Sequence, residues 1–263
     1  MNEIVLTKEA MASLRYFCLF IGYPYSGHSL VGSILDAHPE VVISHELHVG
    51  RLIKKGLTRE QIFAMIVLNS NRFAQIGRTW NHYSYAIPGA WNGQFRRMTV
   101  IGDKKGGKSA NFFTNKSEII GQIEPFFGLT ARYIHVIRNP FDIISTLYRK
   151  SNRAEPDKMR HAVEKILKQI EKVEHIRRSI EPGCWLDLHH EALITDPTRT
   201  ITGLFDFFDL TVPEGFLDNC RKILYASPHQ SRHDIHWKEE EINWVSERLA
   251  KFTVFSTYTF DDK

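Results

Sequence analysis

Residues 16–39, YFCLFIGYPYSGHSLVGSILDAHP, contain the pattern that decides the fold. The apolar, aromatic-rich run 16–21 predicts a buried strand. A glycine-containing turn follows, and apolar residues at helical spacing then predict a helix that ends before His38-Pro39. In a strand, turn and helix of this kind, backbone N–H groups and the positive end of the helix point toward an anion. We therefore expect this segment to bind a phosphate-bearing ligand.

The composition is that of an ordinary globular protein. The 263 residues are 43% hydrophobic and 24% charged, which is enough for one α/β domain with a full core. We expect a single domain over residues 1–263. The net charge of +4 suits a small anionic ligand, and the lack of long Lys/Arg runs argues against nucleic acid as a partner.

Cysteine usage and hydropathy bear on the compartment. The three cysteines are scattered, which indicates free thiols in a reducing compartment. No apolar run approaches the ~20 residues of a membrane span, and the first ten residues, MNEIVLTKEA, lack a signal-peptide pattern. These features predict a cytoplasmic protein without a membrane partner. The oligomeric state stays open, with a homodimer as one alternative.

Strands and helices alternate along the rest of the chain. We expect strands at 98–102, 131–137 and 184–188, helices at 57–76, 158–180 and 238–251, and further helices that begin near Asn139-Pro140 and Asp196-Pro197. The stretch 77–97 has no clean period and is expected to be loop or irregular strand. This order predicts a three-layer α/β/α fold, with helices on both faces of a mainly parallel sheet.

A second candidate phosphate site follows the run 131–137. Arg138 would lie at the carboxyl end of that strand, just before a helix, where a guanidinium can bind a phosphate through two hydrogen bonds. A hydroxyl two turns into the helix, from Ser145 or Thr146, could reach the same group. Taken alone the signal is weak, because an arginine before a capped helix is common.

Together the two segments resemble sulfotransferases that use 3′-phosphoadenosine 5′-phosphosulfate (PAPS). In that family a strand–loop–helix of the form G-x-P-[RK]-S-G-[ST]-[ST] holds the 5′-phosphosulfate, and a later R-[DN]-P-x₅-S element holds the 3′-phosphate. The residues that match are Gly22, Pro24, Ser26, Gly27, Ser29 and Leu30 in the first element, the helix end 35–39, and Arg138 with Thr146 or Ser145 in the second. The segment 186–210 also looks like a family region, and the similar segments come in the family's order.

The resemblance implies a P-loop NTPase-like sulfotransferase fold and transfer of a sulfuryl group from PAPS to a hydroxyl or amine of a small-molecule acceptor. PAP (3′-phosphoadenosine 5′-phosphate) would be the product. The residues that it implies for nucleotide binding are Tyr25, Ser26, Gly27, His28, Ser29, Leu30, Arg138, Ser145, Thr146, His190, Ser227 and Arg232. Among them, His190 stands where an adenine-contacting tyrosine is usual, and Ser227 and Arg232, with Ser231, belong to a loop that closes over the nucleotide in relatives.

The resemblance also implies a general base. In protein-tyrosine and related sulfotransferases a glutamate follows the first helix at a fixed offset, and Glu46 takes that position, with His48 as a neighbour that titrates near neutrality. The alternative is that Glu46 only caps or forms an ion pair at the surface.

Tyr25 departs from the family pattern. Lys or Arg is usual at this position and donates to the bridging oxygen as PAP leaves, whereas tyrosine brings no positive charge. His28, if protonated, and Lys104, in a G-[DE]-K element, are the expected replacements. Without such compensation the chain would be a catalytically weak PAP-binding relative.

A competing motif is GDKKGGKS at 102–109, which satisfies the Walker A pattern of ATP- or GTP-dependent kinases and NTPases. It would follow a middle strand, no clear magnesium-binding acid ends the other strands, and residues 22–30 would have no role. The alternative is tested by ligand dependence, because a kinase needs Mg²⁺ with ATP, whereas a sulfotransferase uses PAPS and no metal in the transfer.

Two further groups of residues were considered as ligand sites. The thirteen histidines include loosely spaced sets at 189–190 and at 229, 233 and 236, but neither set matches an established zinc pattern, so no metal is expected. The aromatic residues of 77–97 either line the acceptor pocket or pack in the core. The residues concerned are Trp80, His82, Tyr83, Tyr85 and Trp91.

Overall fold

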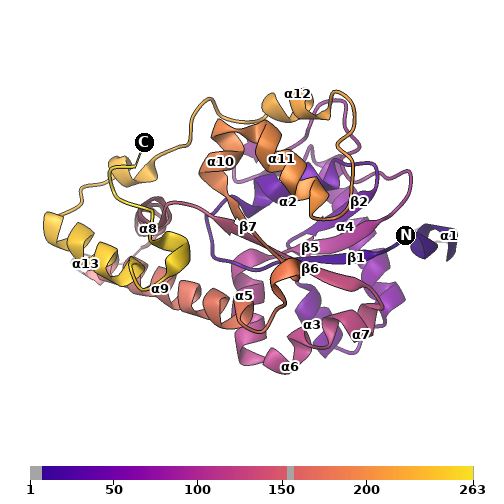
Figure 1. Cartoon of the computed structure of the whole chain (residues 1–263), viewed down its shortest axis with the longest axis horizontal. Coiled ribbons are helices and arrows are strands. Elements are labelled where there is room, and N and C mark those ends of the chain that lie inside the picture. The colour runs from indigo at the N-terminus through magenta and orange to yellow at the C-terminus, as the bar shows by residue number, and fades with distance from the viewer. Residues whose placement is uncertain (1–7, 153–156, 263) are drawn as a thin grey trace.

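The computed structural model describes residues 8–152 and 157–262 (Figure 1). Residues 1–7, most of the segment searched for a signal peptide, lie outside it. Within the described part, five strands form one parallel sheet in the order β2-β5-β1-β6-β7. Their bounds are β1 Tyr16–Phe20, β2 Val41–His45, β5 Val100–Lys104, β6 Thr130–Ile137 and β7 Trp185–His189. A two-stranded antiparallel hairpin lies outside this sheet, with β3 Thr79–Trp80 and β4 Tyr83–Ser84.

Helices cover both faces of the sheet, which confirms the expected three-layer α/β/α arrangement (Figure 1). One face packs against α2 (His28–Asp36), α10 (His190–Thr195), α11 (Pro197–Asp206) and α12 (Phe216–Arg221). The other packs against α4 (Arg59–Gln75), α5 (Gly106–Asn115), α7 (Ile123–Phe127), α8 (Pro140–Arg149), α9 (Asp157–Arg177) and α13 (Glu239–Leu249). The remaining helices are α1 (Lys8–Ala12), α3 (Val49–Lys54) and α6 (Ser117–Ile120), and three 3₁₀ turns lie at Pro182–Cys184, Ser231–Asp234 and Thr253–Phe255. None of the helices in the described residues has the length and apolar character that crossing a membrane requires.

Strand β1 lies at the centre of the sheet and is buried along its whole length. Because side chains alternate along a strand, Phe17 and Leu19 enter the core on one face, and Cys18 and Phe20 enter the core on the other. Full burial of each large apolar side chain contributes about 1.5–3 kcal/mol to stability. A strand buried on both faces must be apolar throughout, and the run 16–21 has that character.

The helix starts predicted from the sequence are correct. Thr58 and Gln61 form a reciprocal capping box at the start of α4, Asn139 accepts a hydrogen bond from the Phe141 N–H at the start of α8, and Asp196 accepts one from the Arg199 N–H at the start of α11. These interactions are local, so they are visible in the sequence.

Two features of the sheet were predicted wrongly or missed. The strand expected at 98–102 is β5, which runs from Val100 to Lys104, because two charged side chains at its end are buried and paired rather than solvated. Strand β2 and helix α3 were not anticipated. The run VVISH of β2 is short, and its edge position in the sheet becomes apparent only from its pairing with β5.

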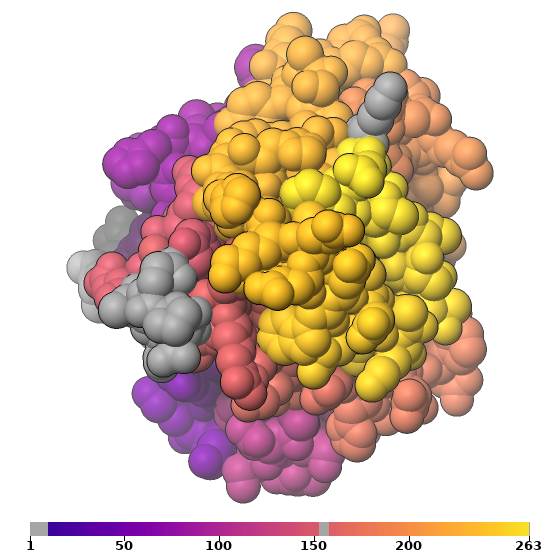
Figure 2. All heavy atoms as spheres, turned by 90° about the vertical axis from the view of Figure 1, so that its left-hand side faces the viewer, coloured from indigo at the N-terminus to yellow at the C-terminus, as the bar shows by residue number. Residues whose placement is uncertain are grey.

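The C-terminal segment covers helices α8 and α9 (Figure 2). The indole N–H of Trp237 donates to the Ser145 hydroxyl at 3.0 Å. Arg232 forms an ion pair with Asp142 at 2.9 Å, and both side chains are buried. The C-terminal residues thus fix α8 in place on the side away from the sheet.

The Walker A-like segment 102–109 does not form a phosphate loop. Gly102 lies inside β5, and only Lys105 separates the end of β5 from the start of α5. By contrast, residues 21–27 separate β1 from α2, which leaves enough backbone to wrap around an anion. Gly102 is required for packing, because a Cβ at this position would lie 2.2 Å from the Cys18 carbonyl oxygen.

We predict that Gly102→Ala destabilises the protein by roughly 2–4 kcal/mol, since the new methyl group would overlap rigid backbone of the neighbouring strand. Urea unfolding followed by circular dichroism measures the change. Gly203→Ala in α11 is the matched control, because a Cβ there meets nothing within 4 Å and alanine stabilises a helix by about 0.5–1 kcal/mol relative to glycine. Equal stability of the two variants would contradict the tight packing of Gly102.

Candidate active site

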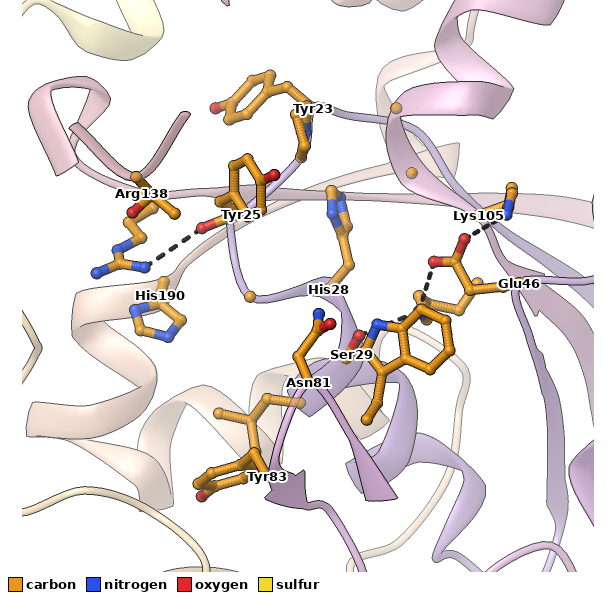
Figure 3. A pocket seen from close by; sticks show the side chains of 18 of the residues that line it. Tyr23, Tyr25, His28, Ser29, Glu46, Asn81, Tyr83, Lys105, Arg138 and His190 are labelled. Atoms are coloured by element: carbon orange, nitrogen blue, oxygen red, sulfur yellow. Dashed lines mark hydrogen bonds and ion pairs between the residues drawn. The ribbon is translucent and has the colours of Figure 1, made fainter. Parts of the chain in front are cut away.

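The carboxyl ends of the five strands meet around one pocket with a volume of about 720 Å³ (Figure 3). This is where open parallel sheets bind ligands, because the loops that follow the strands converge there. Each strand of the sheet contributes to the lining. The lining residues that follow directly from them are Tyr25 after β1, Glu46 after β2, Lys104 and Lys105 at β5, Arg138 after β6 and His190 after β7.

The loop after β1 has the backbone of an anion-binding turn. Tyr25 and Gly27 have positive φ angles, 66° and 100°, and the loop ends at the N-terminus of α2. A Cβ on Gly27 would lie 2.4 Å from the His190 ring, so only glycine fits. The Ser26 hydroxyl faces inward and donates to the Tyr23 carbonyl oxygen at 3.1 Å, so its side chain shapes the loop while Ser29 and Leu30 line the pocket.

Arg138 contacts this loop at Tyr25. Its guanidinium donates to the carbonyl oxygens of Tyr25, at 3.3 Å, and of His229 (Figure 3). Of the two hydroxyls that the sequence left open, Thr146 lines the pocket, whereas the buried Ser145 hydroxyl accepts the hydrogen bond from Trp237 and is outside the lining. The structure therefore places Thr146, not Ser145, near Arg138 in the pocket.

His190 packs between the loop and Arg138. Burial, reinforced by the Arg138 charge, lowers the pKa of His190 to about 3, so the ring is neutral near pH 7. Its Nδ1 atom is buried and has no hydrogen-bond partner in the described residues. A neutral ring with an unused polar atom on the pocket wall is suited to contact a ligand.

Glu46 is held by two lysines (Figure 3). Lys104 Nζ lies 2.7 Å from Glu46 Oε1 and 3.1 Å from the Ser29 hydroxyl, and Lys105 pairs with Glu46 Oε2. Burial opposes ionisation of Glu46, but the two ammonium groups outweigh it and lower the pKa of the carboxyl to about 2. Glu46 is thus a carboxylate that faces the pocket, beside the first turn of α2.

Asp103 positions Glu46, and the sequence analysis did not identify it. Its fully buried carboxylate accepts hydrogen bonds from the Ser44 hydroxyl and from the backbone N–H groups of Leu47, His48 and Val49, at 2.8–3.1 Å. These contacts hold a turn in which Glu46 and His48 have positive φ angles, 64° and 72°. The sequence signal that could have identified Asp103 is a carboxylate that directly follows the apolar residues of a buried strand.

Two histidines do not have the properties expected of them. His28 is buried, and this burial, together with His135 and Lys104, lowers its pKa to about 3. It is therefore neutral near pH 7 and does not supply the positive charge expected beside Tyr25. His48 is buried against Phe112 and lies outside the pocket lining, so it is not placed to take part in chemistry there.

Only part of the expected C-terminal loop reaches the pocket. Arg232 is buried in its pair with Asp142, and Ser227 is exposed, and neither lines the pocket. Tyr225, His229 and Ser231 of the same segment do. Of the three residues named from the sequence, only Ser231 lines the pocket, because the register of an irregular loop is not visible in its composition.

Aromatic side chains form one wall of the pocket. Trp80, Tyr83, Tyr85 and Tyr225 line it, with ring centroids of Tyr83 4.7 Å from Tyr85 and 5.4 Å from Tyr225. His82 and Trp91 do not line the pocket. The hairpin that carries Trp80 and Tyr83 follows Arg78, a buried side chain 2.5 Å from Asp36 at the end of α2. This ion pair fixes the wall to the helix of the phosphate loop.

The lining is strongly cationic. Among the described lining residues there are six Lys or Arg side chains, Lys104, Lys105, Lys108, Arg138, Arg149 and Lys165, and one carboxylate, Glu46. Such an excess of positive charge attracts an anion with several negative groups. No three His, Cys, Asp or Glu side chains of the described residues converge in a way that would hold a metal ion.

Comparison with known proteins agrees with this geometry. A family model described as "Sulfotransferase family" matches residues 19–214. The structure of sulfotransferase STF9 from Mycobacterium avium aligns with a TM-score of 0.52 and 11% identity, over 97% of this chain and 80% of that one. The sulfotransferase domain from the curacin biosynthetic pathway aligns with a TM-score of 0.51 and 14% identity, over 90% and 97%. A search of curated protein sequences returned no significant match. The structural likeness establishes the fold.

We predict that Asp103→Asn destabilises the protein by roughly 2–4 kcal/mol, because an amide lacks the charge and directs its own N–H groups at backbone donors. Ser44→Ala, which removes a single donor to the same carboxylate, should cost about 1 kcal/mol. Urea unfolding of both variants measures the difference. An Asp103→Asn variant as stable as Ser44→Ala would show that the turn holds its shape without this carboxylate.

Proposed function

Since this chain belongs to the sulfotransferase family, we propose that it transfers a sulfuryl group from PAPS to a hydroxyl or amine of a small-molecule acceptor. The observation that carries the proposal is the position of Glu46 and Lys104 beside Ser29, with Arg138 in contact with Tyr25 of the loop between β1 and α2. The loop, Arg138 and the Glu46 carboxylate all line one pocket, which supports assigning them to the phosphosulfate, the 3′-phosphate and the acceptor proton.

The residues present fit a nucleotide with phosphates at both ends of its ribose. The backbone N–H groups of residues 25–30 and the Ser29 hydroxyl would hold the 5′-phosphosulfate. Arg138, with Thr146, would hold the 3′-phosphate. The Nδ1 atom of His190, which has no hydrogen-bond partner in the described residues, would be available to the adenosine part.

The chain's own groups supply the remaining chemistry. PAPS provides an activated sulfuryl group when bound. Glu46 would accept the proton of the acceptor hydroxyl or amine, since a general base near the acceptor is needed to generate the nucleophile. Lys104 lies between Glu46 and Ser29, where it would stabilise negative charge that develops as the sulfuryl group leaves the 5′-phosphate.

For the acceptor we propose an aromatic or flat apolar small molecule. Trp80, Tyr83, Tyr85 and Tyr225 form the wall of the pocket, and aromatic side chains that line a pocket favour an aromatic or apolar partner. Tyrosine hydroxyls on the same wall would orient its polar groups. Binding of ATP with Mg²⁺ at 102–109 stays an alternative for experiment, although that segment lacks a loop.

We predict that PAP binds the purified protein with micromolar affinity and that Arg138→Ala weakens this binding about 10- to 100-fold, the effect of a lost charged hydrogen-bond pair on a phosphate. Isothermal titration calorimetry with PAP, and in parallel with ATP and Mg²⁺, measures both affinities. The exposed Arg160 of α9 provides the control Arg160→Ala. Binding of ATP and Mg²⁺ without PAP would instead indicate a phosphate site at Lys108 and Ser109.

We predict that Glu46→Gln lowers PAPS turnover about 10²- to 10⁴-fold, the contribution of a general base, while PAP affinity changes little. Because the pKa of Glu46 is about 2, the carboxylate stays ionised at about pH 5.5 and at about pH 8, and the fold loss should be similar at both. Release of PAP from PAPS with a panel of phenols measures turnover, and Glu164→Gln, an exposed change on α9, is the control. A large loss of PAP affinity would show that Glu46 is structural.

A further inference from the structure

We propose that Lys105 supplies the positive charge at the reacting sulfuryl group that the tyrosine at position 25 lacks. This inference rests on the proposed function. From the sequence we expected Lys104 and His28 to supply the positive charge that Tyr25 lacks. His28 is buried and neutral, so it is removed as a source of that charge. Lys104 remains, and Lys105 is the second lysine that contacts Glu46 beside it in the pocket.

The Walker A-like segment explains how Lys105 reaches the pocket. A Cβ on Gly106 would lie 2.8 Å from the His28 ring, and one on Gly107 would lie 3.4 Å from Pro24. The two glycines thus let the first turn of α5 lie directly against the phosphate loop. Lys105 immediately precedes that turn and lines the pocket. The motif places cations beside a phosphate loop that the other segment forms.

Lys105 is suited to change partners. Lys104 already neutralises Glu46 at 2.7 Å and also contacts Ser29, so Lys105 is a second positive charge on one carboxylate. Lys105 is only 11% exposed, and the lining residues of the described chain offer it no second carboxylate. The negative oxygens of a bound sulfuryl group would provide one more partner in the same place.

Another lysine near Tyr25 is less suited to this role. Lys150 lies 4.7 Å from the centroid of the Tyr25 ring, but it is exposed and is not part of the pocket lining. Its charge is therefore screened by water. The positions of these two lysines provide a matched pair for experiment, since each is a single positive charge near the loop.

In the transfer step, a bond forms between the acceptor oxygen or nitrogen and sulfur, and the bond between sulfur and the 5′-phosphate oxygen breaks. The bonding electron pair stays on that phosphate oxygen, and the acceptor proton moves to Glu46. Lys105 remains protonated throughout and transfers no proton. By moving from Glu46 to the phosphosulfate, it stabilises the charge that develops on the oxygen between sulfur and the 5′-phosphate and removes one opposing charge from the base.

The test compares Lys105→Met, Lys105→Arg and Lys150→Met, each alone, and Lys105→Met combined with Tyr25→Lys. The readouts are kcat for release of PAP from PAPS, which counts transfer to added phenols and to water alike, and PAP affinity by calorimetry. We expect Lys105→Met to lower kcat at least about 100-fold, as the loss of a preorganised charged group does, with PAP affinity changed less than about threefold. Lys105→Arg should keep most of the activity, and Lys150→Met should behave like the wild type.

The double variant separates a catalytic charge from a structural ion pair. Tyr25→Lys should restore kcat of Lys105→Met by at least about tenfold, because it returns a cation to the same reacting group, whereas it cannot repair the lost contact with Glu46. Unchanged kcat in Lys105→Met, a larger loss in Lys150→Met, or the absence of rescue would overturn the inference while the proposed function stands. Failure of the wild-type protein to bind PAP or turn over PAPS would overturn both.

Discussion

The buried carboxylate of Asp103 is the contact on which the site depends most. It accepts four hydrogen bonds from the end of β2 and the turn that follows. A buried carboxylate without donors would be very costly, so strand and turn are coupled. Asp103 directly precedes Lys104 in β5. The end of β5 therefore both fixes the turn after β2 and carries the lysine that pairs with Glu46. Glu46 and its partner Lys104 are thus positioned by adjacent residues.

Charge and burial divide the pocket into regions with different properties. The end at Glu46 contains two lysines in contact with one carboxylate, so it has net positive charge before any ligand binds. The region near His28 and His190 is neutral, because burial lowers the pKa of both rings to about 3. Arg138 provides positive charge at the far end. This alternation fits a ligand with negative groups at two ends and an uncharged body between them.

Two glycine-containing segments illustrate how a motif's role depends on its surroundings. Residues 22–30 and 102–109 both contain glycines near the junction of a strand and a helix. In the first, the intervening residues form an open loop with positive φ angles at Tyr25 and Gly27. In the second, Gly102 lies inside β5 and packs against Cys18 of the neighbouring strand. Gly106 and Gly107 allow helix α5 to approach the first loop. The sequence pattern alone does not distinguish these arrangements, because the difference lies in where each strand ends.

The sequence by itself determined the fold class, the loop between β1 and α2, the helix starts at Thr58, Asn139 and Asp196, and the segments that surround the pocket. These depend on local hydrogen bonds and on apolar periodicity, which neighbouring residues specify. Only the tertiary structure decided which side chains face the pocket: Thr146 rather than Ser145, and Ser231 rather than Arg232. It also decided the burial of His28 and the contacts of Asp103 and Lys105. Burial and ion pairing between residues far apart in the chain control these properties, and local sequence does not encode them.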